Sequence, residues 1–191
     1  MTMKKKLAVA ISALVLLSGC GSVGSSSPQE SFVAGNGATT YIAPQDRVKA
    51  PTISGMTLLG TDYRLPKNQY AVVNVWASWC SPCRAEEPVL AALTKIYPEV
   101  NFVGILTRDN PVNAEAFVRK NKSPYPTIID DSVLSGFSKT LPANAIPTTL
   151  VLDGSGRVAG RISGVVTIAS LSELLDKVKS DKVPSDKVQS K

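Results

Sequence analysis

The sequence contains no histidine in 191 residues. This absence excludes Ser-His-Asp triads, Cys-His dyads and every metal site that uses an imidazole ligand. Cysteine is scarce too, with three residues, whereas a zinc site needs about four ligands. Aromatic residues make up 6% of the chain, and no basic stripe interleaved with aromatics marks a nucleic-acid-binding surface. We therefore expect neither a metal nor a nucleic acid as a partner.

Acidic residues are missing from the first part of the chain. None precedes Glu30, while Lys4, Lys5 and Lys6 supply three of the formal net charge of +6. An apolar run, Leu7–Leu17, follows these lysines, and its 11 residues are short against the roughly 20 that a membrane-spanning helix needs. A charged segment followed by a short apolar one is typical of an export signal, so residues 1–19 are predicted to be a signal peptide.

The apolar run ends in Leu17-Ser18-Gly19-Cys20, which resembles the lipobox of bacterial lipoproteins. The resemblance implies that Cys20 is lipidated, becomes the first residue after cleavage, and anchors the protein on the extracytoplasmic side of a membrane in the cell envelope. The alternative is an ordinary signal peptide with a cysteine nearby by chance. Without the first 19 residues, 18 basic residues face 15 acidic ones, which leaves a net charge of +3.

Composition divides the remainder into three parts. Residues 20–45 begin with a Gly/Ser-rich stretch and are predicted to be a flexible linker behind the lipid anchor. Residues 46–179 are expected to form one folded domain, a size that can bury its own core. Residues 180–191 repeat the motif Ser-Asp-Lys-Val and are predicted to be a disordered tail.

Hydrophobic patterning inside the domain alternates between strands and helices. Apolar runs predict strands at Tyr70–Trp76, Asn101–Leu106, Thr148–Leu152 and Arg157–Ser163. Helical spacing and capping residues predict helices at Cys83–Tyr97, Asn110–Lys120, Ser132–Thr140 and Thr167–Lys179. A small leading hairpin is expected around Gly60. The fold class is therefore α/β, with a mixed central β-sheet flanked by helices.

Cys80 and Cys83 lie where the first buried strand ends and a helix begins. Residues i and i+3 share a helix face, so their sulfurs can reach disulfide distance. A helix N-terminus favours the thiolate, which is the species that attacks disulfides. Cys80 is thus the expected nucleophile and Cys83 the resolving thiol. The alternatives are a structural disulfide and half of a zinc site.

The segment Val72–Pro88, with the string Trp-Ala-Ser-Trp-Cys-Ser-Pro-Cys-Arg-Ala-Glu-Glu-Pro, resembles the active-site segment of the TlpA/ResA-like branch of the thioredoxin superfamily. The likeness covers roughly residues 49–179. It implies a thioredoxin-like fold with an N-terminal β-hairpin extension. It also implies a membrane-anchored or periplasmic thiol-disulfide oxidoreductase whose redox group is a Cys80–Cys83 disulfide, with no other cofactor.

The resemblance also implies a substrate-binding surface around the cysteines. Pro147, just before a predicted strand, corresponds to the cis-proline that faces the Cys-x-x-Cys in this superfamily, and the backbone around Ile146 would pair with a substrate strand. The remaining expected substrate contacts are Trp79, Ser81 and Pro82. The alternative role for Pro147 is to start a strand.

Asn74 stands where many thioredoxins have a buried aspartate that accepts a proton from the resolving thiol. Asn cannot titrate, and the nearest carboxylates are Glu86 and Glu87, at i+3 and i+4 from Cys83. The resemblance favours Glu86, because family members keep an acid there. The alternative for both is an exposed carboxylate that pairs with Arg84 or Lys95, and we expect this for Glu87.

The family's commonest task is reduction of exported proteins, notably of apocytochrome c before haem attachment, with electrons from a membrane thiol transporter. We expect this function, in a monomeric protein.

A first alternative is an oxidant that forms disulfides in exported proteins, although no charge lies between the cysteines at Ser81 and Pro82 to stabilise the reduced form. A second is a non-catalytic binding lipoprotein or metallochaperone; copper chaperones of this fold use a different spacing and a histidine. A peroxidase is disfavoured, because its nucleophile does not sit in such a motif.

Overall fold

The computed structural model describes residues 37–138 and 145–181. The predicted signal peptide, Cys20 and nearly all of the predicted tail lie outside the described residues. No helix in the described part of the chain is both long and apolar enough to cross a membrane.

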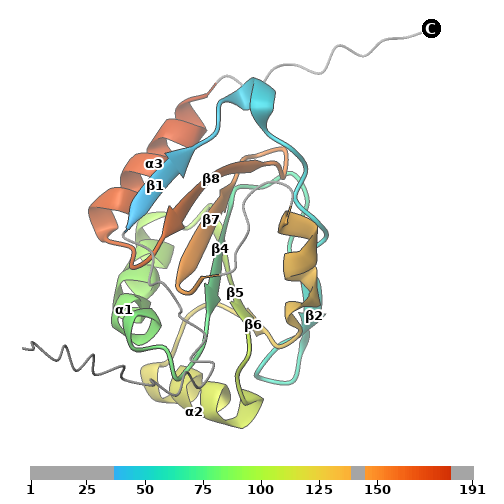
Figure 1. Cartoon of the computed structure of the whole chain (residues 1–191), viewed down its shortest axis with the longest axis vertical. Coiled ribbons are helices and arrows are strands. Elements are labelled where there is room, and N and C mark those ends of the chain that lie inside the picture. Colours follow the sequence, from blue (N-terminus) through green and yellow to red (C-terminus); the bar gives the residue numbers. More distant parts are fainter. Residues whose placement is uncertain (1–36, 139–144, 182–191) are drawn as a thin grey trace, which may run out of the picture. The chain divides into compact units, whose positions relative to one another are not determined.

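A six-stranded mixed sheet forms the centre of the domain, in the order β1-β8-β7-β4-β5-β6 (Figure 1). β4 runs parallel to β5, and β5 to β6, while β7, β8 and β1 add antiparallel pairs on the other side. The strands are β1 (Ala38–Tyr41), β4 (Ala71–Trp76), β5 (Asn101–Leu106), β6 (Thr127–Ile128), β7 (Thr148–Leu152) and β8 (Val158–Ser163). This confirms the predicted mixed sheet.

Helices cover both faces of the sheet because its central strands are buried on both sides. On one face α1 (Ser81–Ile96) and α3 (Ile168–Ser180) pack side by side and bury Leu90, Leu93, Leu171 and Leu175 in a cluster with residues of β4, β5, β7 and β8. The opposite face is covered by the 3₁₀ helix η2 (Asp131–Phe137) and by the leading hairpin. α2 (Pro111–Asn121) lies at the end of the molecule where β4 leads into α1.

The leading hairpin is present as a separate two-stranded sheet. It consists of β2 (Ser54–Met56) and β3 (Asp62–Arg64), with Gly60 at a φ of +76° in the connecting turn, a conformation that favours glycine. The sequence predicted the two strands of this hairpin at Thr57–Leu58 and Tyr63–Arg64. β3 contains the second pair, whereas β2 ends just before the first.

The predicted start of the domain at residue 46 is wrong. β1 lies inside the stretch expected to be linker, yet it pairs antiparallel with β8 from Ala38 opposite Ser163 to Tyr41 opposite Gly160. Such a four-residue edge strand carries little hydrophobic signal, because most of its side chains are exposed. A further short 3₁₀ turn, Pro44–Asp46, follows it.

A cluster of buried charges holds this N-terminal segment to the domain. Arg47 is 7% exposed and forms ion pairs with Asp153, at 3.3 Å, and with Asp181. Asp181 also accepts a hydrogen bond from Tyr41 at 2.8 Å. Ser180 and Asp181 therefore belong to the folded domain, although the tail was predicted to begin at residue 180.

Two other elements differ from the sequence prediction. The short helix expected at Ser132–Thr140 is a 3₁₀ helix, η2. The segment is short, and its Ser and Gly residues have a low α-helix propensity. β6 was not predicted, since two residues give no periodic signal.

Candidate active site

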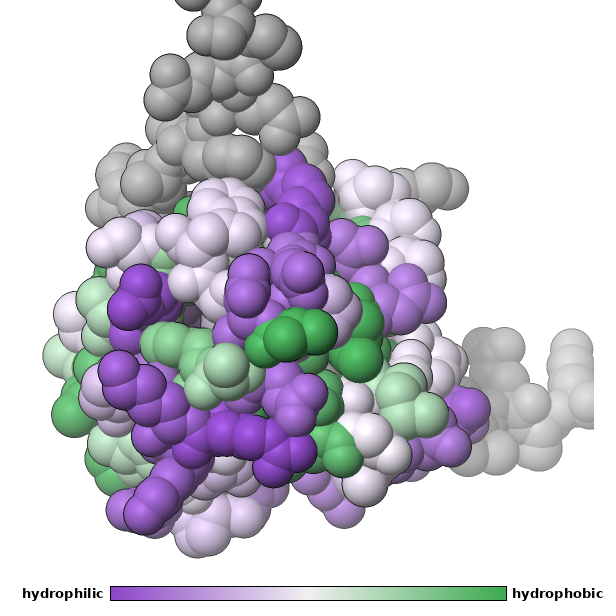
Figure 2. Space-filling model, turned by 90° about the horizontal axis from the view of Figure 1, so that it is seen from below, coloured by the Kyte–Doolittle hydropathy of each residue, from purple (hydrophilic) through white to green (hydrophobic). Residues whose placement is uncertain are grey.

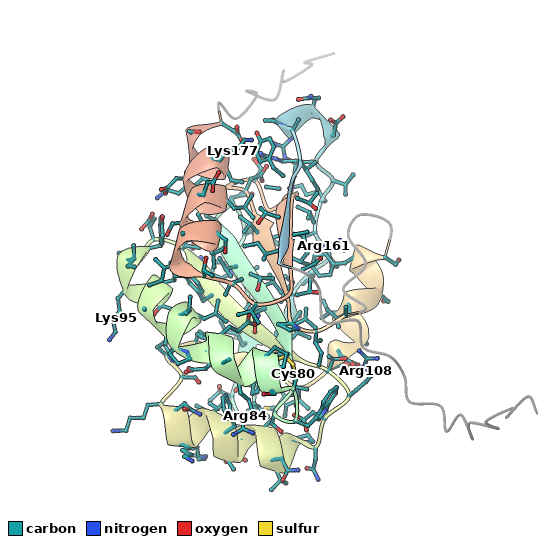
Figure 3. All side chains as sticks on the ribbon, turned by 60° about the vertical axis from the view of Figure 1, so that its left-hand side comes forward. Cys80, Arg84, Lys95, Arg108, Arg161 and Lys177 are labelled. Atoms are coloured by element: carbon teal, nitrogen blue, oxygen red, sulfur yellow. A yellow bond between two sulfur atoms is a disulfide. The ribbon has the colours of Figure 1, made fainter. Side chains whose placement is uncertain are left out.

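Cys80 and Cys83 form a disulfide at the N-terminus of α1, with a Cα–Cα distance of 5.3 Å. Cys80 is the N-cap residue, and its Sγ accepts a hydrogen bond from the Cys83 backbone N–H at 3.2 Å. Figure 3 shows Cys80 at the start of α1, at the opposite end of this helix from Lys95. No helix or strand lies between β4 and α1. Both sulfurs therefore lie at the carboxyl end of β4, a central strand of the sheet.

The loop between β4 and α1 is held in place by residues of the loop that follows β5. The Asp109 carboxylate accepts a hydrogen bond from the backbone N–H of Ser78, and the Arg108 carbonyl accepts one from Trp79 Nε1 at 2.9 Å. Arg108 and Asp109 lie in the loop between β5 and α2. Only the parallel pairing of β4 and β5, which brings the two strand ends together, shows that they position the active-site loop.

Ile146 and Pro147 lie beside the disulfide. The peptide bond between them is cis, as the resemblance implied. Ile146 is 2% exposed and packs in the same apolar cluster as Cys80 and Cys83. The expected active-site proline is thus brought to the cysteines from a segment more than 60 residues later in the chain.

The surface around the disulfide mixes apolar and polar side chains. Trp79 is 48% exposed, Ser81 is exposed and Pro82 is half-buried, whereas both cysteines are buried. Figure 2, which views the molecule from the α2 end, shows apolar side chains emerging among hydrophilic ones on this face. A partially apolar rim next to a reactive disulfide suits the binding of another polypeptide.

Glu86 is fully buried between α1, β4 and the loop that precedes α3. Its Oε1 accepts a hydrogen bond from Asn74 Nδ2 at 2.8 Å, and its Oε2 accepts one from the Val166 backbone N–H at 3.0 Å. Burial raises the pKa of Glu86 from its ordinary 4.5 to about 7, although the hydrogen bonds from Val166 and Asn74 act in the opposite direction. The same loop binds the proline, because Gly164 donates its backbone N–H to the Pro147 carbonyl.

Glu87 is not the exposed surface carboxylate that we expected. It is 6% exposed and accepts a hydrogen bond from Ser123 Oγ at 2.7 Å, and it forms no ion pair with Arg84 or Lys95 among the described residues. The sequence held a signal for this burial: Cys83, Glu87 and Leu90 follow the i, i+4, i+7 spacing of the buried face of α1. The signal was missed because carboxylates are seldom buried.

The arrangement can exchange disulfides. A helix N-terminus supplies unpaired N–H groups to a sulfur at the N-cap, which favours the thiolate of Cys80 when the disulfide is reduced. Cys83 lies one turn further inside, in position to attack Cys80 and close the disulfide again. The described residues contain no group of three or more Cys, Asp or Glu side chains arranged to hold a metal ion.

Comparison with known proteins agrees with a disulfide-exchanging site. Residues 43–161 match the AhpC/TSA family. The probable thiol:disulfide interchange protein DsbE-2 of Pasteurella multocida is 36% identical over 121 residues, which cover 61% of this chain and 62% of that protein. The thiol-disulfide oxidoreductase ResA of Geobacillus thermodenitrificans is 29% identical over 123 residues, which cover 62% of this chain and 67% of that protein.

A solved structure is similar as well. The secreted thiol-disulfide isomerase of Corynebacterium glutamicum superposes with a TM-score of 0.68 at 29% identity, covering 81% of this chain and 96% of that one. The chain spans less than two thirds of the length of the Pasteurella relative and of two further curated relatives. From the matching family, the thioredoxin-like fold and the cysteine pair on α1, we conclude that the chain belongs to the AhpC/TSA family, among thioredoxin-like proteins of the ResA and DsbE type.

Proposed function

We propose that this protein is an extracytoplasmic thiol-disulfide oxidoreductase that acts as a monomer and reduces disulfides in exported proteins. The observation that carries the proposal is the Cys80–Cys83 disulfide at the N-terminus of α1, beside the Ile146–Pro147 segment. The names of two relatives, thiol:disulfide interchange protein and thiol-disulfide oxidoreductase, describe this kind of reaction.

The reaction begins with the reduced dithiol. The Cys80 thiolate attacks one sulfur of the substrate disulfide, and the other substrate sulfur leaves with the electron pair of the broken bond. Cys83 then loses its proton and attacks Cys80 Sγ, which forms the Cys80–Cys83 disulfide and releases the second substrate sulfur. Two electrons pass to the substrate, and a dithiol donor must return two electrons before the next turnover.

Glu86 is the titrating group of the proposed site. Its pKa of about 7 means that its charge changes near neutral pH, one helical turn from Cys83. A negative charge there opposes a second negative charge on the thiols, so ionised Glu86 disfavours the thiolate form of the reduced protein. Strong oxidants of this fold owe their potential to a strongly stabilised reduced form. The Glu86 charge acts against the stabilisation that the helix N-terminus gives to the Cys80 thiolate, which favours reduction as the physiological direction.

The membrane is the proposed location of the electron donor, a thiol-transporting membrane protein. Lipidation of Cys20 would tether the domain through the residues that precede β1. Ala38, the first residue of β1, pairs with Ser163, which pairs with Thr148, which in turn pairs with Val75. This row lies at the end of the sheet where β4 leads to Cys80. The chain therefore enters the described domain at its active-site end, which supports exchange with a membrane partner and with thiols of apocytochrome c.

Measuring the reduction potential of the Cys80–Cys83 pair tests the direction of the reaction. We expect a value close to the roughly −270 mV of thioredoxin, together with reduction of insulin disulfides that is lost in Cys80→Ser. A potential near −120 mV, typical of strong oxidants, would instead favour disulfide formation in exported proteins. Retained insulin reduction in Cys80→Ser would contradict the proposed chemistry.

A further inference from the structure

A small cavity lies on the inner side of Cys83, between α1, β4, β6 and the end of α2. Cys83, Glu87 and Ser123 line it together with Trp76, Tyr125 and Thr127. Its volume of about 10 Å³ is close to the minimum that holds one water molecule. The resolving cysteine and a buried carboxylate thus line the same small cavity.

Two buried polar atoms in this wall lack a partner. Trp76 Nε1 and Thr127 Oγ1 form no hydrogen bond with the part of the chain that the structure describes. Both atoms lie close to Gly104, because a Cβ built there would lie 2.9 Å from Trp76 Nε1 and 2.5 Å from Thr127 Oγ1. An unpaired buried donor or acceptor costs about 1–3 kcal/mol, so a donor and an acceptor at one place indicate a bound water.

Glu87 and Glu86 differ in what they face. Both oxygens of Glu86 accept hydrogen bonds from fixed donors, Asn74 Nδ2 and the Val166 backbone N–H, and Glu86 is not in the cavity wall. Glu87 lies at i+4 from Cys83 on the same helix face and is in the wall with it. Its partner Ser123 is only partly buried, so the Ser123 hydroxyl connects the Glu87 carboxylate to solvent.

We propose that the cavity holds a water molecule through which Glu87 accepts the proton of the Cys83 thiol in the resolving step. This rests on the proposed function. With Cys80 bound to substrate as a mixed disulfide, the Cys83 S–H bond breaks and its proton passes through the water to Glu87. The Cys83 thiolate then forms the bond to Cys80 Sγ, and the electron pair of the Cys80–substrate bond leaves with the substrate sulfur. Glu87 afterwards returns its proton to solvent past Ser123.

The surroundings leave Glu87 as the acceptor. Asn74 and Trp76 from β4 and Thr127 from β6 do not titrate, and α2 contributes Phe117 and Val118. The Arg84 guanidinium lies over the Phe117 ring, 5.8 Å from its centroid. The pKa of Tyr125 is raised above its ordinary value of 10, first by burial and then by the charges of Glu87 and Glu86, so its phenol stays protonated near neutral pH.

The test separates the two steps by mixing the reduced full chain with 5,5′-dithiobis(2-nitrobenzoate) in a stopped-flow instrument. Attack by Cys80 releases one coloured thiolate, and resolution by Cys83 releases the second. All proteins carry Cys20→Ala, so that only the active-site thiols react. We expect Glu87→Gln to slow the second release about 100-fold at pH 7, a typical contribution of a positioned base, and to leave the first unchanged. Its residual rate should rise about tenfold per pH unit, since hydroxide then replaces the carboxylate.

Two further variants keep the outcome decisive. Glu115→Gln removes an exposed carboxylate on α2 and should behave as wild type. Thr127→Val keeps the side-chain volume and removes the unpaired hydroxyl. If the cavity holds a water, this variant should release the second thiolate more slowly. If the cavity is dry, the protein should be more stable and the rate of the second release unchanged. Unchanged rates and pH profiles in Glu87→Gln, or in Thr127→Val should Glu87→Gln not fold, would overturn the proposal. Failure of the wild type to release the first thiolate would instead contradict the proposed function.

Discussion

Replacing Glu86 by glutamine should remove a pH dependence from the stability of this protein. Glu86 is fully buried, and burial raises its pKa in the folded chain to about 7, against 4.5 for an ordinary glutamate. Between these two pH values the folded state binds a proton that the unfolded state does not bind. The stability of the wild type must therefore fall as the pH rises from 4.5 to 7, and the full cost of the buried carboxylate remains above pH 7.

The magnitude follows from the two pKa values. Each pKa unit corresponds to about 1.36 kcal/mol, so the change from 4.5 to about 7 amounts to about 3 kcal/mol. Glutamine has no charge to bury, and its carbonyl can accept the hydrogen bond from Asn74 or from Val166. The free energy of unfolding of Glu86→Gln, relative to wild type, should therefore increase by about 3 kcal/mol between pH 4.5 and pH 8.

Urea denaturation of the oxidised protein at pH values from 4.5 to 8 measures this difference directly. Subtracting wild type from variant at each pH cancels the titration of all other groups. Glu115→Gln, which removes an exposed carboxylate, serves as the control and should show no such trend. A difference between Glu86→Gln and wild type that is the same at pH 4.5 and pH 8 would refute the reasoning, because Glu86 would then titrate alike in the folded and unfolded chains.

Three other outcomes are expected. Cys83→Ser should accumulate mixed disulfides with partner proteins in cells, because no resolving thiol remains, whereas Cys80→Ser should trap none; the reverse pattern on non-reducing gels would exchange their roles. Cys20→Ala should release the protein from washed membranes without loss of disulfide exchange, and a variant that stays bound would contradict the lipid anchor. Arg47→Met should lower the free energy of unfolding by about 3 kcal/mol in denaturation experiments, since it leaves Asp153 buried with one fewer cation; an unchanged stability would mean that Arg157 suffices.

The local chemistry of this protein could be read from its sequence. The cysteine pair depends on the i, i+3 spacing within one helical turn, and the apolar runs of β4, β5 and β7 are recognisable because a strand buried on both faces is apolar throughout. Capping residues also act over a few positions, so the start of α2 behind Asn110 was predicted correctly. Signals of this kind need no knowledge of the rest of the chain.

Contacts between distant segments could be decided only by the tertiary structure. The sheet edge on β8 recruits the polar β1, and Arg47 reaches Asp153 and Asp181 across more than 100 residues. The two neighbouring carboxylates on α1 illustrate the same limit, because their hydrogen-bond partners come from other elements of the fold. Glu86 faces Asn74 and Val166, while Glu87 faces Ser123 and the cavity beside Cys83. Burial and hydrogen-bond partners set what a carboxylate does, and both come from elements that pack on α1 from elsewhere in the chain.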